Sequence, residues 1–294
     1  MSSPTRPVLR YHGGKFRIAD WIVSFFPGHG CYLEPFGGGA SVLMRKDRVG
    51  TEIYNDLDGD VVNLFRVLRD HGTAAELWHR LRFTPFARAE FDAAYSDPTD
   101  PVDQAHKLCV RSFMGHGSDS ATRRTRPGFR TKRSRSGTEG GGFTRSPACE
   151  FAAYPDAIHG FHERLAGVVI ENRHAIDLIH QFDSPTTLIY ADPPYVLSSR
   201  TLMRGSSNSS HGYRHEMSDD EHRALVECLR NCRSMVVLSG YASDLYDREL
   251  YPDWQRFERK AVAEAGKART EVVWLNHACS TALIGQQAQQ RLIA

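Results

Sequence analysis

Long apolar runs and paired cysteines are missing from this sequence of 294 residues. No stretch approaches the roughly 18 consecutive apolar residues that a membrane span requires, so no membrane association is expected. The opening residues, MSSPTRPVLR, are not followed by the apolar core of a signal peptide, which indicates a cytoplasmic protein. The six cysteines include no CxxC pair of the kind typical of zinc sites, so no metal is expected.

Charge is nearly balanced overall but unevenly distributed along the chain. The formal net charge is +2, from 37 basic and 35 acidic residues, and 40% of the residues are hydrophobic. Such a composition can bury a substantial core and argues against a disordered chain. Between Arg111 and Pro147, however, nine lysines and arginines stand against two acids. A mildly acidic body with one strongly basic segment indicates a polyanionic partner.

The periodicity of apolar residues predicts an α/β fold with a Rossmann-like sheet. Short apolar runs, expected to be strands, occur at 31–36, 51–55, 168–170, 187–191, 235–238 and 272–275. Helical spacing follows several of them, and Ala40–Lys46 is expected to start a helix after three glycines. Ser218 and Glu221 form a capping box for a helix that runs to about Asn231. Strand, glycine-rich turn and helix in succession are typical of a doubly wound domain.

This alternation stops between residues 72 and 165, where helical stretches lead into a segment rich in glycine, serine and arginine. We therefore expect two parts. Residues 1–71 and 166–294 would form one discontinuous sheet domain, and residues 72–165 would form a mainly helical, basic domain inserted into it.

Two features mark the carboxyl ends of the first two predicted strands. Glu34-Pro35-Phe36 leads into Gly37-Gly38-Gly39, and such a turn lets the backbone approach a ligand closely. Packing alone explains many strand–helix turns with glycine equally well. Asp56 follows the second strand, where α/β proteins hold ribose hydroxyls. The alternative is an Asx turn or a helix N-cap, for which the nearby Asp58 is equally suited.

The most specific motif is Asp192-Pro193-Pro194-Tyr195, directly after the apolar run 187–191. Two successive prolines hold the backbone extended and offer carbonyls without N–H groups. A carboxylate and a neighbouring carbonyl can then accept both hydrogens of an amino group on a planar ring, which directs the nitrogen lone pair outward as a nucleophile. The tyrosine ring offers a surface for stacking that heterocycle. A proline-stiffened turn without a function is the competing interpretation.

Together these motifs resemble the Dam-type adenine-specific DNA methyltransferases, which use S-adenosyl-L-methionine. The matching segments, in that family's order, are Arg10–Lys15 (RYHGGK), Glu34–Gly39 (EPFGGG), Tyr54–Asp56 (YND), Asp192–Tyr195 (DPPY), Val237–Tyr241 (VLSGY) and Glu271–Asn276 (EVVWLN). The likeness covers nearly the whole chain. It implies a site-specific enzyme that methylates the exocyclic amino nitrogen of adenine in DNA, with the target base flipped out of the duplex.

The resemblance also implies roles for individual residues. S-adenosyl-L-methionine would be bound by Tyr11, Lys15, Glu34, Pro35, Phe36, Gly37, Gly38, Gly39, Asp56 and Asp192, and catalysis would rest on Asp192, Pro193, Pro194 and Tyr195. Residues 1–71 and 166–294 would be the catalytic domain, and residues 72–165 the target-recognition domain. Where relatives often have an aspartate near the cofactor's adenine, the sequence has Glu171-Asn172-Arg173-His174, so Asn172 and Arg173 are the candidates for that contact.

Basic residues of the insert are the candidates for binding double-stranded DNA: Arg123, Arg124, Arg126, Arg130, Lys132, Arg133 and Arg135. Clustered positive charge attracts phosphates whatever the base sequence, and it makes binding steeply salt-dependent. A solvated basic loop is the favoured interpretation for any single arginine proposed to read a base. His211 and His215 lie near a polar Ser/Asn/Gly stretch and are expected in a surface loop that closes near the active site.

Two other functions stay open beside adenine methylation. The chemistry of the DPPY motif also suits the cytosine amino group or RNA. A DNA-binding relative that has lost catalysis is the second alternative, against which the intact Lys15, Asp56 and Asp192 argue. As an enzyme of DNA modification, the protein would serve restriction–modification or the protection of phage DNA.

Overall fold

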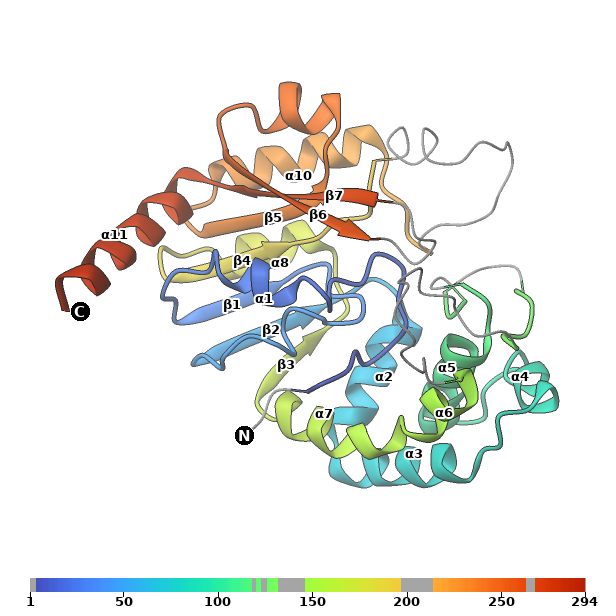
Figure 1. Cartoon of the computed structure of the whole chain (residues 1–294). Helices are drawn as coiled ribbons and strands as arrows, with labels where there is room; N and C mark the ends of the chain where they lie inside the picture. Colours follow the sequence, from blue (N-terminus) through green and yellow to red (C-terminus); the bar gives the residue numbers. More distant parts are fainter. Residues whose placement is uncertain are drawn as a thin grey trace, which may run out of the picture.

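A seven-stranded sheet forms the centre of the protein (Figure 1). The structure is a computed structural model that describes residues 4–117, 120–122, 126–131, 146–196, 214–262 and 268–293. The strands are β1 (Cys31–Glu34), β2 (Thr51–Asn55), β3 (Val168–Glu171), β4 (Thr187–Ala191), β5 (Met235–Tyr241), β6 (Gln255–Val262) and β7 (Ala268–Leu275). Their order is β3-β2-β1-β4-β5-β7-β6, parallel as far as β5, with β7 antiparallel to both its neighbours. This sheet confirms the predicted Rossmann-like α/β fold.

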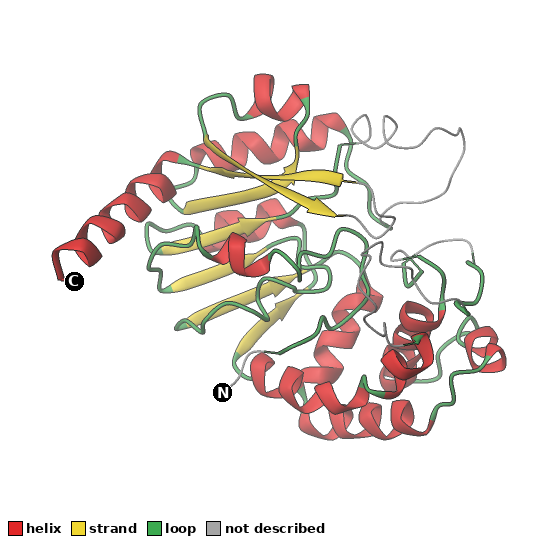
Figure 2. Ribbon diagram, viewed as in Figure 1, coloured by secondary structure: helices red, strands yellow, loops and turns green. Residues whose placement is uncertain are grey.

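Helices cover both faces of the sheet, and several gather on one side of it (Figure 2). They are α1 (Ala19–Val23), α2 (Gly59–Arg69), α3 (His71–Phe83), α4 (Arg88–Ala93), α5 (Pro101–Met114), α6 (Pro147–Ala152), α7 (Ile158–Leu165), α8 (Ala175–Phe182), α10 (Asp219–Asn231) and α11 (His277–Ile293), with short 3-10 and π helices at Pro155–Ala157 and Leu245–Leu250. The expected capping box at the start of α10 is present, with Ser218 and Glu221 bonded reciprocally.

Alternate side chains of the strands enter two apolar cores, one on each face. Tyr54 and Tyr190 belong to the core that contains residues of α2 and α5. Ile53 and Ile189 belong to the core that contains residues of α8 and α10. Because neighbours along a strand point to opposite faces and both faces are covered, β4 and β5 are buried along their whole length.

The helical segment between residues 72 and 165 packs on α2. This helix contacts α3, α5 and α7, and one apolar cluster includes Tyr54 of the sheet, Phe65 of α2 and Leu108 of α5. The helical part is therefore joined to the sheet by a continuous core. The boundaries at residues 72 and 165, and the separate roles of the two parts, stay predictions.

Two local expectations are wrong. Residues 41–46 form hydrogen-bonded turns rather than a helix. Ala40 has a φ of 50°, and the whole run Ala40–Met44 is buried, so this segment has no exposed face of an amphipathic helix. Strand β6 was not expected, because most of its side chains up to Lys260 are exposed and charged, as is common at a sheet edge.

Candidate active site

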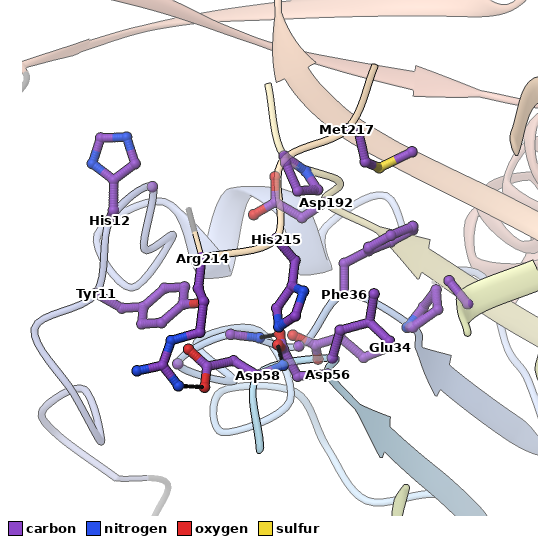
Figure 3. Close-up of a pocket in the computed structure, with 18 of the residues that line it drawn as sticks. Tyr11, His12, Glu34, Phe36, Asp56, Asp58, Asp192, Arg214, His215 and Met217 are labelled. Atoms are coloured by element: carbon purple, nitrogen blue, oxygen red, sulfur yellow. Dashed lines mark hydrogen bonds and ion pairs between the residues drawn. The ribbon is translucent and has the colours of Figure 1, made fainter. Parts of the chain in front are cut away.

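A cavity of about 300 Å³ lies where the carboxyl ends of β1, β2 and β4 meet. Open α/β sheets bind ligands at this kind of place, beyond the carboxyl ends of the strands where the strand order reverses. Figure 3 shows Glu34, Asp56 and Asp192 around one space. All ten residues expected at the cofactor line it: Tyr11, Lys15, Glu34, Pro35, Phe36, Gly37, Gly38, Gly39, Asp56 and Asp192. The structure thus brings them together, and their individual roles stay predictions.

The glycine turn is shaped by two tyrosine rings. The amide of Gly37 donates to the carbonyl of Asn55 at 2.7 Å, which ties the turn to the end of β2. A Cβ atom on Gly37 would overlap the ring of Tyr54, and one on Gly38 would come within 2.7 Å of the ring of Tyr11. Gly38 also has a φ of +47°, which residues with a side chain rarely adopt. Glycine is therefore required at both positions by packing, and the backbone is exposed to the cavity as a result.

Asp56 forms the Asx turn that was one interpretation of its sequence position, and it also lines the cavity. Its Oδ1 accepts from the amide of Asp58 at 2.8 Å, which makes an Asx turn, and its Oδ2 accepts from the amide of Gly38 at 2.8 Å. Burial raises the pKa of Asp56 to about 6, although both amides lower it. Asp58 is the N-cap of α2 and accepts from the amide of Asp60 at 3.0 Å. Asp56 therefore supports a structural turn and lines the cavity, and its contact with a ligand stays a prediction.

Residues 214–217 form a wall of the cavity that the motifs did not predict. The guanidinium of Arg214 lies 2.8 Å from Asp58 Oδ1 and 2.9 Å from Asp60 Oδ2. His215 follows and lies between Asp56 and Asp192 in the close-up view (Figure 3). His215 therefore lies near the active site, as expected, whereas His211 falls outside the described residues.

Glu34 ends β1 as a buried carboxyl group beside the cavity. Its Oε2 accepts from the hydroxyl of Tyr32 at 2.8 Å and from the amide of Leu43 at 3.1 Å. Burial raises the pKa of Glu34 to about 8, because these two bonds and Lys46 only partly offset the loss of water. Near neutral pH the protonated form of Glu34 therefore predominates.

The carboxylate of Asp192 forms an ion pair with a lysine and accepts a hydrogen bond from a serine hydroxyl. The ammonium of Lys15 lies 2.8 Å from Oδ1 and 2.9 Å from Oδ2, and the hydroxyl of Ser239 donates to Oδ1 at 2.9 Å. Burial raises the pKa of Asp192, whereas Lys15 and Ser239 act in the opposite direction. Burial alone would lower the pKa of Lys15, but attraction to Asp192 and Glu271 raises it. The geometry therefore favours an ionised carboxylate facing the cavity.

The rest of the DPPY motif is partly covered. Pro194 lines the cavity, whereas Pro193 and Tyr195 are not among its lining residues. The Tyr195 hydroxyl contacts the ammonium of Lys15, and its ring packs on Tyr241 with centroids 4.3 Å apart. The residue is 5% exposed, and the Lys15 ammonium lies 4.8 Å from the centroid of its ring. Stacking of a base on Tyr195 therefore stays a prediction.

The candidates for the cofactor's adenine do not line the cavity. Asn172 donates to the carbonyl of Asp56 at 2.7 Å, and Arg173 pairs with Gln181 at 2.6 Å. His174, Ala175 and Ile176, one step further along the chain, are lining residues instead, together with Phe36, Met217 and Leu225. The residues that contact the cofactor's adenine therefore stay a prediction.

Only part of the basic segment is described. Arg123, Arg124, Lys132, Arg133 and Arg135 lie outside the described residues. Arg126 pairs with Asp92, and Arg130 Nη1 lies 2.9 Å from Glu150 Oε2. The segment is attached to the end of α5, since the amide of Arg130 donates to Met114 at 2.7 Å. The structure therefore shows both described arginines engaged with acids of the protein itself.

Comparison with known proteins agrees with the motifs. Residues 11–109 match the D12 class of N6 adenine-specific DNA methyltransferases. A DNA adenine methylase of Haemophilus influenzae is 37% identical over 65 residues, which is 22% of each chain. A DNA N-6-adenine-methyltransferase of Escherichia phage P1 is 25% identical over 90% of this chain, which spans 34% of that protein. A DNA adenine methylase of Salmonella typhi is 21% identical over 91% of this chain and 92% of its own length.

These similarities confirm the predicted resemblance to the D12-class, Dam-type adenine-specific DNA methyltransferases. An enzyme of this class needs a methyl donor and DNA. Among the described residues, no helix is long and apolar enough to cross a membrane. Within the same part of the chain, no group of three potential metal ligands occurs.

Proposed function

We propose that the protein is a site-specific DNA methyltransferase that transfers a methyl group from S-adenosyl-L-methionine to the exocyclic amino nitrogen of adenine. The observation that carries the proposal is the position of Asp192. It follows the central strand β4, opens the DPPY motif and lines the same cavity as the glycine turn and Asp56. One cavity can therefore hold a methyl donor beside an amine acceptor.

The residues around the cavity fit S-adenosyl-L-methionine. Asp56 and Asp58 offer carboxylate oxygens to ribose hydroxyls, and Asp58 Oδ2 is buried without a hydrogen-bond partner in the described part of the chain. Phe36 and Ile176 offer apolar surface to the adenine ring. When bound, the cofactor supplies an activated methyl group, whose carbon–sulfur bond breaks as the carbon–nitrogen bond to the substrate forms.

The chain's own contribution to the reaction is orientation and charge. Asp192 would accept a hydrogen bond from the target amine, which keeps the nitrogen lone pair available and directs it toward the methyl group. Lys15 stabilises the ionised carboxylate through direct contact at 2.8 Å. Because both groups are held in place before the substrate arrives, positioning and electrostatics supply the rate.

DNA would bind on the side of the inserted helical part. A base inside a duplex cannot reach a half-buried carboxylate, so the target adenine would turn out of the helix, which costs a few kcal/mol. The basic residues Arg123, Arg124, Arg126, Arg130, Lys132, Arg133 and Arg135 would offset this through phosphate contacts. We place the enzyme in the bacterial cytoplasm, or in the host's if a phage encodes it, because its substrate is there.

The proposal is tested by expressing the protein in cells without adenine methylation and sequencing their DNA with a method that detects modified bases. We expect N6-methyladenine in one short sequence context, and none with the Asp192→Asn variant. Methylcytosine alone, or methylated RNA with unmodified DNA, would establish the alternative substrate. Purified protein that binds DNA but neither binds S-adenosyl-L-methionine nor transfers a methyl group would establish an inactive relative.

A further inference from the structure

The carboxylate of Asp192 has one oxygen whose acceptor positions are filled. A carboxylate oxygen accepts about two hydrogen bonds. Oδ1 accepts from Ser239 at 2.9 Å and shares the Lys15 ammonium, at 2.8 Å, with Oδ2, which lies 2.9 Å from it and has no second donor among these contacts. The same ammonium also contacts the carbonyl of Gly13 and the hydroxyl of Tyr195. Among the described contacts, Oδ2 therefore keeps one acceptor position, and Oδ1 keeps none.

The hydroxyl of Ser239 is itself held in place. Ser239 lies on β5 and Tyr190 on the adjacent β4, and their hydroxyl oxygens are 2.8 Å apart. Both residues are buried, at 2% and 1% exposure. A hydroxyl has one hydrogen, and an ionised carboxylate has none to give. Ser239 therefore donates to Asp192, and Tyr190 donates to Ser239.

We propose that Ser239, oriented by Tyr190, is a positioning residue that sets the rotation of the Asp192 carboxylate and so makes Oδ2 the oxygen that accepts the target amine. This inference rests on the proposed function. Lys15 comes from the N-terminal segment and contacts both oxygens, so it cannot distinguish them. Ser239 contacts Oδ1 alone and comes from a fully buried strand, so it selects one orientation. A rigid support of this kind keeps a reacting group in its productive geometry.

The test compares Ser239→Ala, Tyr190→Phe and the double variant with the wild type. Methyl transfer from tritiated S-adenosyl-L-methionine to unmethylated genomic DNA is measured as kcat and as KM for each substrate. We expect Ser239→Ala to lower kcat on the order of 10- to 100-fold with both KM values within about 3-fold, because a misdirected carboxylate impairs the reacting geometry and not binding. Tyr190→Phe removes only the outer hydroxyl and should lower kcat less.

The double variant separates a hydrogen-bonded chain from two unrelated effects. If Tyr190 acts only through Ser239, Tyr190→Phe has no further effect on kcat once Ser239 is alanine. If the kcat of the double variant falls by the product of the two single losses, the inference is overturned. An unchanged kcat in Ser239→Ala would also overturn it. Loss of kcat together with a lowered urea midpoint and raised KM values would do the same, since that result indicates a structural role.

The activity of the wild-type protein separates a failure of this inference from a failure of the proposed function. Adenine methylation by the wild type with normal turnover by Ser239→Ala overturns the positioning role alone. Absence of adenine methylation by the wild type overturns the proposed function, and the positioning role is overturned with it.

Discussion

Lys15 and Asp192, 177 residues apart in the sequence, form an ion pair with the ammonium nitrogen 2.8 Å from one carboxylate oxygen and 2.9 Å from the other. The side chain of Lys15 is 3% exposed and that of Asp192 is 18% exposed. Because water reaches neither group freely, each charge is stabilised by the opposite charge beside it. A lysine of the N-terminal segment thus completes a site that otherwise belongs to the centre of the sheet.

Asp192→Asn should abolish most methyl transfer and lower stability at once. The variant leaves the buried ammonium of Lys15 without its counter-charge, which is expected to lower the free energy of unfolding by about 3 kcal/mol. Methyl transfer should fall at least on the order of 100-fold, while the Kd for S-adenosyl-L-methionine changes little. Urea denaturation, single-turnover kinetics and calorimetry measure the three quantities. Unchanged turnover would contradict the role of Asp192.

Combining Asp192→Asn with Lys15→Met provides the control. Without a buried unpaired charge, stability should return toward that of the wild type, whereas activity should stay lost. Activity that returns together with stability would show that Asp192 supports the fold and not the reaction.

Arg214→Ala should weaken cofactor binding, because Arg214 fixes the wall 214–217 to Asp58 and Asp60. Charge-assisted hydrogen bonds of this kind contribute a few kcal/mol when buried, but Arg214 is 36% exposed and screened by water. We expect the Kd to rise roughly ten-fold, or about 1.4 kcal/mol, as measured by calorimetry. Arg223→Ala is the matched control. Arg223 lies on an exposed part of α10 and pairs with Asp220 and with Glu249 of the π helix Leu245–Leu250, so its loss should leave the Kd unchanged.

Gly37→Ala should destabilise the protein by roughly 2–3 kcal/mol, because the added methyl group overlaps the buried ring of Tyr54. Gly160→Ala is the control: Gly160 lies within α7 and has open space at its Cβ position. That substitution should raise stability by roughly 0.5–1 kcal/mol through helix propensity. Equal urea midpoints for the two variants would contradict the packing argument.

The sequence predicts the elements that are marked by a continuous run of residues. The apolar runs of β4 and β5 indicated buried strands because parallel strands are covered on both faces. Strand β6 lacks such a run, since its edge position exposes charged side chains to water. The composition of Ala40–Lys46 is compatible with a helix, and only the packing reveals that consecutive residues there are buried.

The site divides in the same way. Motif residues such as Asp56 and Asp192 were found because each follows directly after a strand. Arg214 and Met217 carry no motif, and they reach the cavity only because the chain returns across it before α10. Two local signals concern this part of the chain: the polar stretch before His215, which predicts a loop near the site, and the capping box at Ser218, which sets the start of α10.

Glu34 should make stability fall as pH rises from about 5 to 8. Its pKa is raised to about 8 in the folded protein by burial, whereas the unfolded chain has an ordinary glutamate value of 4.5. Between these values the folded state holds a proton that the unfolded state has lost, so raising the pH favours unfolding, by up to about 1.4 kcal/mol per pH unit. Urea denaturation at several pH values measures the slope. Glu34→Gln should flatten it, whereas the exposed Glu76→Gln should not.

Replacing the basic residues should flatten the salt dependence of DNA binding, and two of them should contribute less than the others. Each phosphate contact adds about 0.9 to the slope of log K against log salt. Glutamine at Arg123, Arg124, Lys132, Arg133 and Arg135 together should lower that slope by up to about 4.5. Glutamine at Arg126 and Arg130 should lower it by less than about 1, because Asp92 and Glu150 already offset these charges. Fluorescence anisotropy with a labelled duplex at several salt concentrations measures both. Slopes and affinities equal to the wild type in both variants would show that DNA binds elsewhere.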